Sequence, residues 1–142
     1  MKTIYFFKGF FSLALFLIIT TKVFAQPIGA TFNNPINAGT ISPGMVYTDT
    51  KNNAPANGFG NDYGQPSDDI YYKFTLNTAA EVSISNCSST FDTYLHILDA
   101  EGNLITFKDD NGPLCPGLPS SIKVQLSEGI YYVVAEGYNL TI

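Results

Sequence analysis

Residues 92–107 read DTYLHILDAEGNLITF, and this stretch sets the architecture of the chain. From Asp92 to Asp99 the centre is apolar on both alternating faces, which is typical of a buried central strand. Residues 100–103, Ala-Glu-Gly-Asn, have the composition of a turn. Leu104 to Phe107 then predicts a second strand that returns antiparallel to the first.

Similar strand patterns flank this pair along the rest of the chain. They lie at Met45–Thr50, Ile70–Leu76, Glu81–Ser85, Ser121–Leu126 and Ile130–Ala135. Turns that carry glycine separate them, and no helical period intervenes. The sequence therefore predicts an all-β fold, an antiparallel β-sandwich of jelly-roll type. We expect residues 26–66 to supply an N-terminal strand and a long Gly/Asn/Pro loop, and residues 67–142 to form the core.

The N-terminus has the three parts of a secretory signal. Lys2 and Lys8 supply the positive charge at the start of the signal, and an apolar run covers residues 9–19. Val-Phe-Ala at 23–25 forms a small-x-small cleavage site. The apolar run is shorter than the roughly 20 residues that cross a bilayer. We therefore predict a cleaved signal peptide over residues 1–25 rather than a retained anchor, and a secreted, periplasmic or cell-surface protein without stable membrane insertion.

Cleavage at this site makes the remaining chain strongly acidic. Four lysines and no arginine stand against twelve acidic residues, a net charge of −8. Such a surface repels phosphate backbones, so we expect no nucleic-acid partner. The remaining length suits one domain, which we expect to be a monomer.

The chain has two cysteines, Cys87 and Cys115, and one histidine, His96. Export favours a disulfide between the cysteines. It would close a loop of about 28 residues and contribute about 3–4 kcal/mol. The alternative is a metal-binding or catalytic thiol, and a catalytic thiol usually needs a histidine partner. His96 lies inside an apolar strand without a catalytic motif around it, so we expect a core or cross-strand histidine.

Acidic residues offer the candidate metal ligands. The run Asp109-Asp110 is followed by Asn and Gly, and oxygen-rich loops of this kind suit Ca²⁺, which takes six to eight oxygens. The alternative is a turn, which the same residues favour. Asp68 and Asp69 form a second candidate pair, and Asp92 is a third candidate. All of these acids converge if the sandwich brings the strand ends together.

Aromatic residues offer the candidate ligand contacts. The chain is rich in tyrosine and has no tryptophan. Tyrosines within strands are expected to pack in the sandwich. Phe59 and Tyr63 instead lie in the Gly/Asn loop, so we predict that they contact a glycan or protein ligand.

Three segments in order resemble the bacterial pre-peptidase C-terminal (PPC) domain family. They are residues 68–76 (DDIYYKFTL), residues 91–105 followed by Asp-Asp-Asn at 109–111, and residues 126–134 (LSEGIYYVV). The cysteine pair is similar to that of the secreted Bacteroidetes variant. The resemblance implies a jelly-roll sandwich without enzymatic activity, appended to secreted proteases or surface proteins, with relatives that bind calcium and a protein or glycan.

The sequence departs from the family pattern at its end. Residues 136–138 run directly into residues 139–142, where the family has a Gly/Ser-rich turn and a last strand. We therefore expect a non-catalytic secreted or surface accessory module for ligand binding or stabilisation. The alternatives are a truncated fragment of a large surface protein and a small secreted hydrolase that uses the acidic cluster.

Overall fold

The structure, a computed structural model, describes residues 25–139. The predicted signal peptide lies almost entirely outside the described residues. Within them lie the strands and one short 3₁₀ helix, namely β1 (Ile36–Ile41), η1 (Pro55–Asn57), β2 (Ile70–Leu76), β3 (Ala80–Ser85), β4 (Thr93–Leu98), β5 (Leu104–Lys108), β6 (Ser121–Leu126) and β7 (Gly129–Gly137). In this range no helix is long and apolar enough to cross a membrane.

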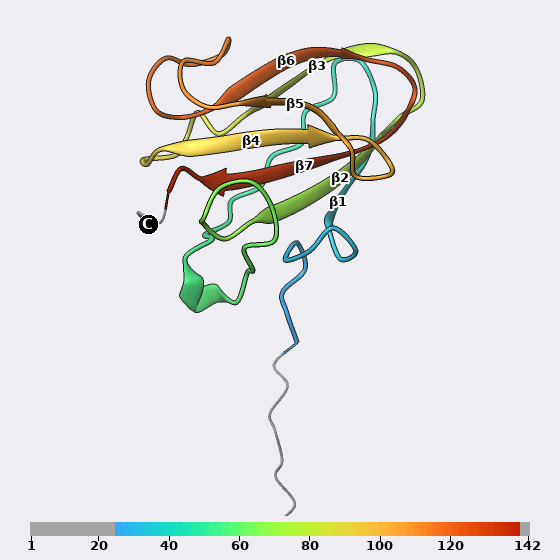
Figure 1. The fold of residues 1–142 in the computed structure, drawn as a ribbon. Helices are drawn as coiled ribbons and strands as arrows, with labels where there is room; N and C mark the ends of the chain where they lie inside the picture. Colours follow the sequence, from blue (N-terminus) through green and yellow to red (C-terminus); the bar gives the residue numbers. More distant parts are fainter. Residues whose placement is uncertain (1–24, 140–142) are drawn as a thin grey trace, which may run out of the picture.

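The strands form two sheets, one of five strands in the order β1-β2-β7-β4-β5 and one of β3 and β6 (Figure 1). The expected return of β5 along β4 is confirmed, with Ile97 opposite Thr106. The main core lies between the sheets, because alternate side chains of β2, β4 and β7 face β6. Leu95 and Ile97 of β4 are 1% and 0% exposed, as expected of a central strand.

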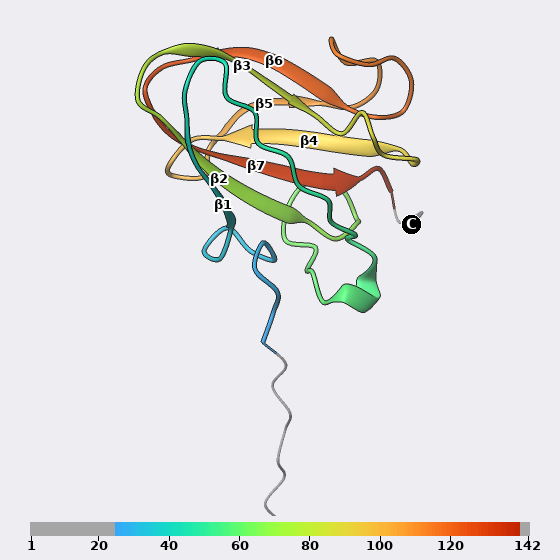
Figure 2. The ribbon, with the colours of Figure 1, turned by 180° about the vertical axis from the view of Figure 1, so that it is seen from behind.

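The N-terminal strand differs from the prediction in place and direction. Residues 45–50 form no strand, and β1 at Ile36–Ile41 pairs parallel with β2, so the larger sheet is mixed rather than purely antiparallel. Parallel neighbours need a long crossover. Residues 42–69 provide it, and the teal segment after β1 crosses the sheet in Figure 2. Val46 is 84% exposed there, so little burial favours a strand.

The outer face of the larger sheet, which points away from β3 and β6, carries a second cluster around Tyr71, Leu98 and Val134. Two segments cover part of this face. Phe32 of the first stacks on Tyr132 with ring centroids 4.2 Å apart. The second segment, residues 59–68, is called the strap here, and it crosses in front of β2 and β7 in Figure 1.

Candidate functional site

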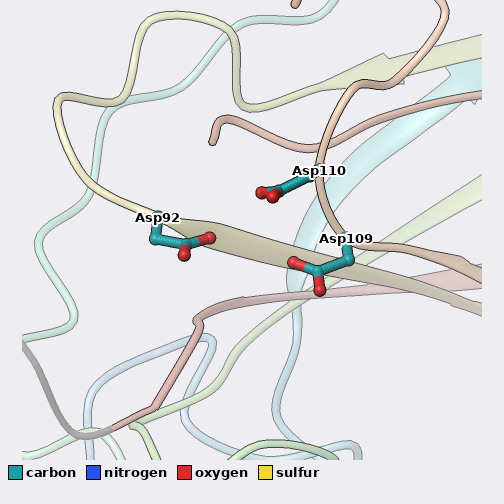
Figure 3. A group of neighbouring side chains, drawn as sticks. All are labelled: Asp92, Asp109 and Asp110. Atoms are coloured by element: carbon teal, nitrogen blue, oxygen red, sulfur yellow. The ribbon is translucent and has the colours of Figure 1, made fainter. Parts of the chain in front are cut away.

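Three carboxylates meet at one end of the β4–β5 pair. Asp92 directly precedes β4, while Asp109 and Asp110 directly follow β5, so the antiparallel pairing brings them to the same end. Their nearest oxygens lie within 4.8 Å of one another, and Figure 3 shows the side chains facing one another. Each carboxylate has one buried oxygen without a hydrogen-bond partner in the described chain. The cluster thus offers oxygen ligands of the type that Ca²⁺ prefers.

The electrostatics of this cluster favour a bound cation. Burial raises the pKa of Asp92, and the charges of Asp110 and Asp109 raise it further. Burial also raises the pKa of Asp109, with a further rise from Asp110 and a lowering by Lys108. A divalent cation would relieve this mutual repulsion.

The predicted disulfide is present and joins the two loops that carry the cluster. Cys87 lies between β3 and Asp92, Cys115 lies between Asp110 and β6, and their Cα atoms are 5.7 Å apart. Buried hydrogen bonds support the same junction: the Ser120 N–H donates to Thr93 Oγ1 at 2.8 Å, and the two hydroxyl oxygens are 2.9 Å apart. The loops are therefore fixed relative to each other.

Gly112 lets the loop after Asp110 lie very close to the start of β6. A Cβ atom on Gly112 would lie 2.6 Å from the backbone nitrogen of Ser121 and even closer to its carbonyl oxygen. The loop after Asp110 therefore rests on the start of β6, which sets the position of the acidic residues.

The structure separates Asp68 and Asp69 from this cluster. Both precede β2, and β7 lies between β2 and β4 in the sheet. Asp69 is fully buried, and its Oδ2 accepts the N–H groups of Asp62 at 2.7 Å and Tyr63 at 2.8 Å. Asp92, rather than this pair, completes the group with Asp109 and Asp110.

Buried polar residues hold the strap on the outer face. Glu136 of β7 is 2% exposed, and its Oε1 lies 2.5 Å from His96 Nε2 of β4, so His96 is a buried cross-strand histidine as expected. Glu136 Oε2 accepts the N–H of Gln65 at 2.7 Å. Gly64 has φ +56°, and a Cβ there would collide with Glu136 and His96. Glu136 was not among the predicted site residues, although its charge stands out after the apolar residues 130–135.

Burial shifts the pKa of Asp69, the residue that anchors the strap. It raises the pKa of Asp69 to about 7. The N–H groups of Asp62 and Tyr63 oppose this rise, and the neighbouring carboxylate of Glu136 adds to it. Asp69 therefore tends to hold a proton that an exposed aspartate would release.

An aromatic strip, formed by Phe107, Tyr94 and Tyr138, lies beside the acidic cluster. Tyr94 stacks nearly parallel to Phe107, at 5.6 Å and 11°, and to Tyr138, at 6.4 Å and 15°. Phe107 is 53% exposed. Burial raises the pKa of Tyr94 and the charge of Asp109 raises it further, which places the strip next to the carboxylates. The strip was not predicted from the sequence, because its three rings come from β4, from β5 and from the residue directly after β7, which lie side by side only in the folded sheet.

The two predicted ligand contacts lie in different depressions. Phe59 lines one with Pro27, Ile28 and Lys51. Tyr63 lines another on the outer face, and its ring meets His96 edge-on at 4.9 Å. Tyr63 therefore packs on the sheet while leaving part of its surface open.

Comparison with protein-family models, curated proteins and solved structures finds no match to this chain. The described residues define a disulfide-linked protein of two β-sheets, with an acidic cluster and an aromatic strip at one end.

Proposed function

We propose that this chain is an exported, non-catalytic accessory module, a jelly-roll β-sandwich of PPC type, which binds a glycan through its aromatic strip. The stacked, partly exposed rings of Phe107, Tyr94 and Tyr138 beside three carboxylates are the observation that carries the proposal. Aromatic faces give apolar contact, and tyrosine hydroxyls give polar tips at the rim. The disulfide supports export, because such bonds persist in oxidising compartments.

The arrangement of titratable groups supports a binding role over a hydrolytic one. His96 Nε2 is engaged by Glu136, and Gly64 of the strap lies directly above both. General acid–base catalysis requires such groups to reach a substrate. Among the described residues the acidic cluster brings together three carboxylates, and no histidine or cysteine joins them.

We propose further that Asp92, Asp109 and Asp110 bind Ca²⁺. Their unpartnered buried oxygens and mutual repulsion support this assignment. The disulfide and the Ser120–Thr93 hydrogen bonds fix the two loops, so a bound ion would meet a preformed set of ligands.

Calcium at millimolar concentration is expected to raise the melting temperature of the exported chain, and EDTA to reverse the rise. A ligand that binds only the folded state stabilises it by mass action, by about 2.7 kcal/mol at a hundredfold excess over Kd. Differential scanning fluorimetry measures the shift. The double variant Asp109→Asn/Asp110→Asn should lose it, and Asp68→Asn, outside the cluster, should keep it. No calcium shift in the unmodified chain would contradict the assignment.

Phe107→Ser is expected to weaken retention on insoluble glycans by about three- to tenfold, since an aromatic contact contributes about 0.5–1.5 kcal/mol. The measurement is depletion of the protein from solution by cellulose, chitin and xylan particles. Ile130→Ser is the matched control, because Ile130 is an exposed apolar residue of β7 outside the strip. Equal retention of the two variants would contradict glycan binding by the strip.

A further inference from the structure

A groove on the outer face, separate from the aromatic strip and the acidic cluster, has the composition of a cation site. It is an open depression of about 480 Å³ between the segment that carries Phe32, the strap and the turn before β5. That size lies within the usual range of small-molecule sites. Aromatic rings and carboxylates dominate its lining, which includes Phe32, Tyr63, Tyr71, Leu98, Asp62 and Glu101.

The rings of the groove are held in place by the fold. Tyr71 and Leu98 form the floor and are 3% and 1% exposed. The Phe32 ring stacks on Tyr132 and lies beside the turn at Gly102, where a Cβ would be in ordinary contact with the ring at 3.5 Å. A preformed site of this kind loses less conformational entropy when a ligand binds.

The second wall is equally fixed, because the strap is anchored there. The Tyr63 N–H donates to the buried Asp69, and its ring meets His96 edge-on. Asp69 also accepts the N–H of Asp62, so the carboxylate of Asp62 is carried by the same anchored backbone. One aromatic wall and one charge are therefore positioned together.

The charged side chains that line the groove are both acidic. Asp62 and Glu101 lie at its exposed rim, and no lysine is among its lining residues. Burial raises the pKa of Tyr71, and the nearby charges of Asp69, Asp62 and Glu136 raise it further, which indicates a negative potential at the floor. Anionic ligands are therefore disfavoured.

We propose that this groove binds a small alkylammonium ligand between the rings of Phe32 and Tyr63, above the buried Tyr71. Aromatic faces attract organic cations through the ring quadrupole, and carboxylates at the rim add Coulombic attraction. A hard metal ion would need six or more oxygens, which aromatic walls do not provide. The combination of apolar faces and negative charge therefore selects a cation with an apolar surface.

Choline is the probe for the test, titrated into the folded exported chain by isothermal calorimetry against sodium chloride of equal ionic strength. We expect saturable binding, at least about tenfold tighter than that of its neutral isostere, in which a tert-butyl group replaces the trimethylammonium. Phe32→Leu should weaken choline binding by about tenfold. Tyr47→Leu, which removes an exposed aromatic ring of the crossover outside the groove, should leave it unchanged.

Glu101→Gln keeps the test independent of folding, because Glu101 is exposed on a turn while Phe32 also packs on Tyr132. It should weaken choline binding by about two- to fivefold and reduce its salt dependence. Three results would overturn the proposal: no saturable binding of choline, equal binding of the neutral isostere, or displacement of choline by cellobiose, which would assign the groove to neutral sugars. None of these results bears on the aromatic strip.

Discussion

Replacing Cys87 and Cys115 together by serine is expected to lower the free energy of unfolding by about 3–4 kcal/mol. The melting temperature should fall by on the order of 10 °C. The bond joins residues separated by 28 positions, and it restricts the unfolded chain more than the folded one. The loss acts mainly through the unfolded chain, because the hydrogen bonds of Ser120 with Thr93 and Asn86 still span the same two loops in the folded variant.

Urea denaturation of the double variant beside the oxidised chain measures this difference. Reductant should shift the unmodified chain to the midpoint of the variant and leave the variant itself unchanged. A midpoint of the unmodified chain that does not respond to complete reduction would contradict the stabilising role of the bond. The calcium shift of the variant, measured alongside, reports how far the bond positions Asp92 against Asp109.

Asp69→Asn is expected to raise stability at pH 8 by up to about 4 kcal/mol and to leave it nearly unchanged at pH 4. The pKa of Asp69 is raised from 3.8 to about 7 in the fold. The folded state therefore keeps a proton that the unfolded chain releases. This contribution to stability is fully present below about pH 4 and is lost as the pH rises through about 7.

The asparagine reproduces the protonated form of Asp69. Its carbonyl oxygen can accept the N–H groups of Asp62 and Tyr63, as Oδ2 does in the aspartate. Its amide replaces the proton beside Glu136. The variant thus removes the repulsion between two buried carboxylates without removing the strap's anchor.

Chemical denaturation at several pH values between 4 and 8 measures the slope, and the difference between variant and unmodified chain isolates Asp69 from the other acids. Asp99→Asn is the control of opposite sign, because hydrogen bonds from Asn103 hold the pKa of Asp99 below its usual range. Its removal should lower stability at neutral pH. A parallel pH dependence of Asp69→Asn and the unmodified chain would contradict the assignment.

Most strands could be predicted from the pattern of apolar residues. Burial of one face of a strand gives alternating apolar and polar residues, and burial of both faces gives a continuous apolar run. Ser121–Leu126 is a strand over the residues predicted. Residues 45–50 alternate equally well, yet they lie exposed on a crossover. Alternation records the pattern of one segment and carries no information about its pairing partner, so the parallel β1–β2 pair could not be predicted.

The candidate site likewise contains contacts that local sequence predicts and contacts that it does not. Asp92 meets Asp109 and Asp110 because β4 and β5 form one hairpin with a recognisable turn. The local sequence was therefore enough to suggest that these acids converge. The contact of Glu136 with His96 depends on β7 lying between β2 and β4. The place of Tyr138 in the aromatic strip depends on the same pairing of β7 with β4. Such contacts join residues distant in sequence, and single-sequence patterns do not encode them.

The strand order has a consequence for when the chain can fold. The last strand of the described residues, β7, occupies the centre of the larger sheet and bonds to β2 on one side and β4 on the other. Until Gly129–Gly137 arrives, β1 with β2 and β4 with β5 are two unconnected halves. A chain delivered from its N-terminus, by synthesis or by translocation, therefore completes this sheet only after Gly129–Gly137 has been delivered, and non-local pairing of this kind is slow.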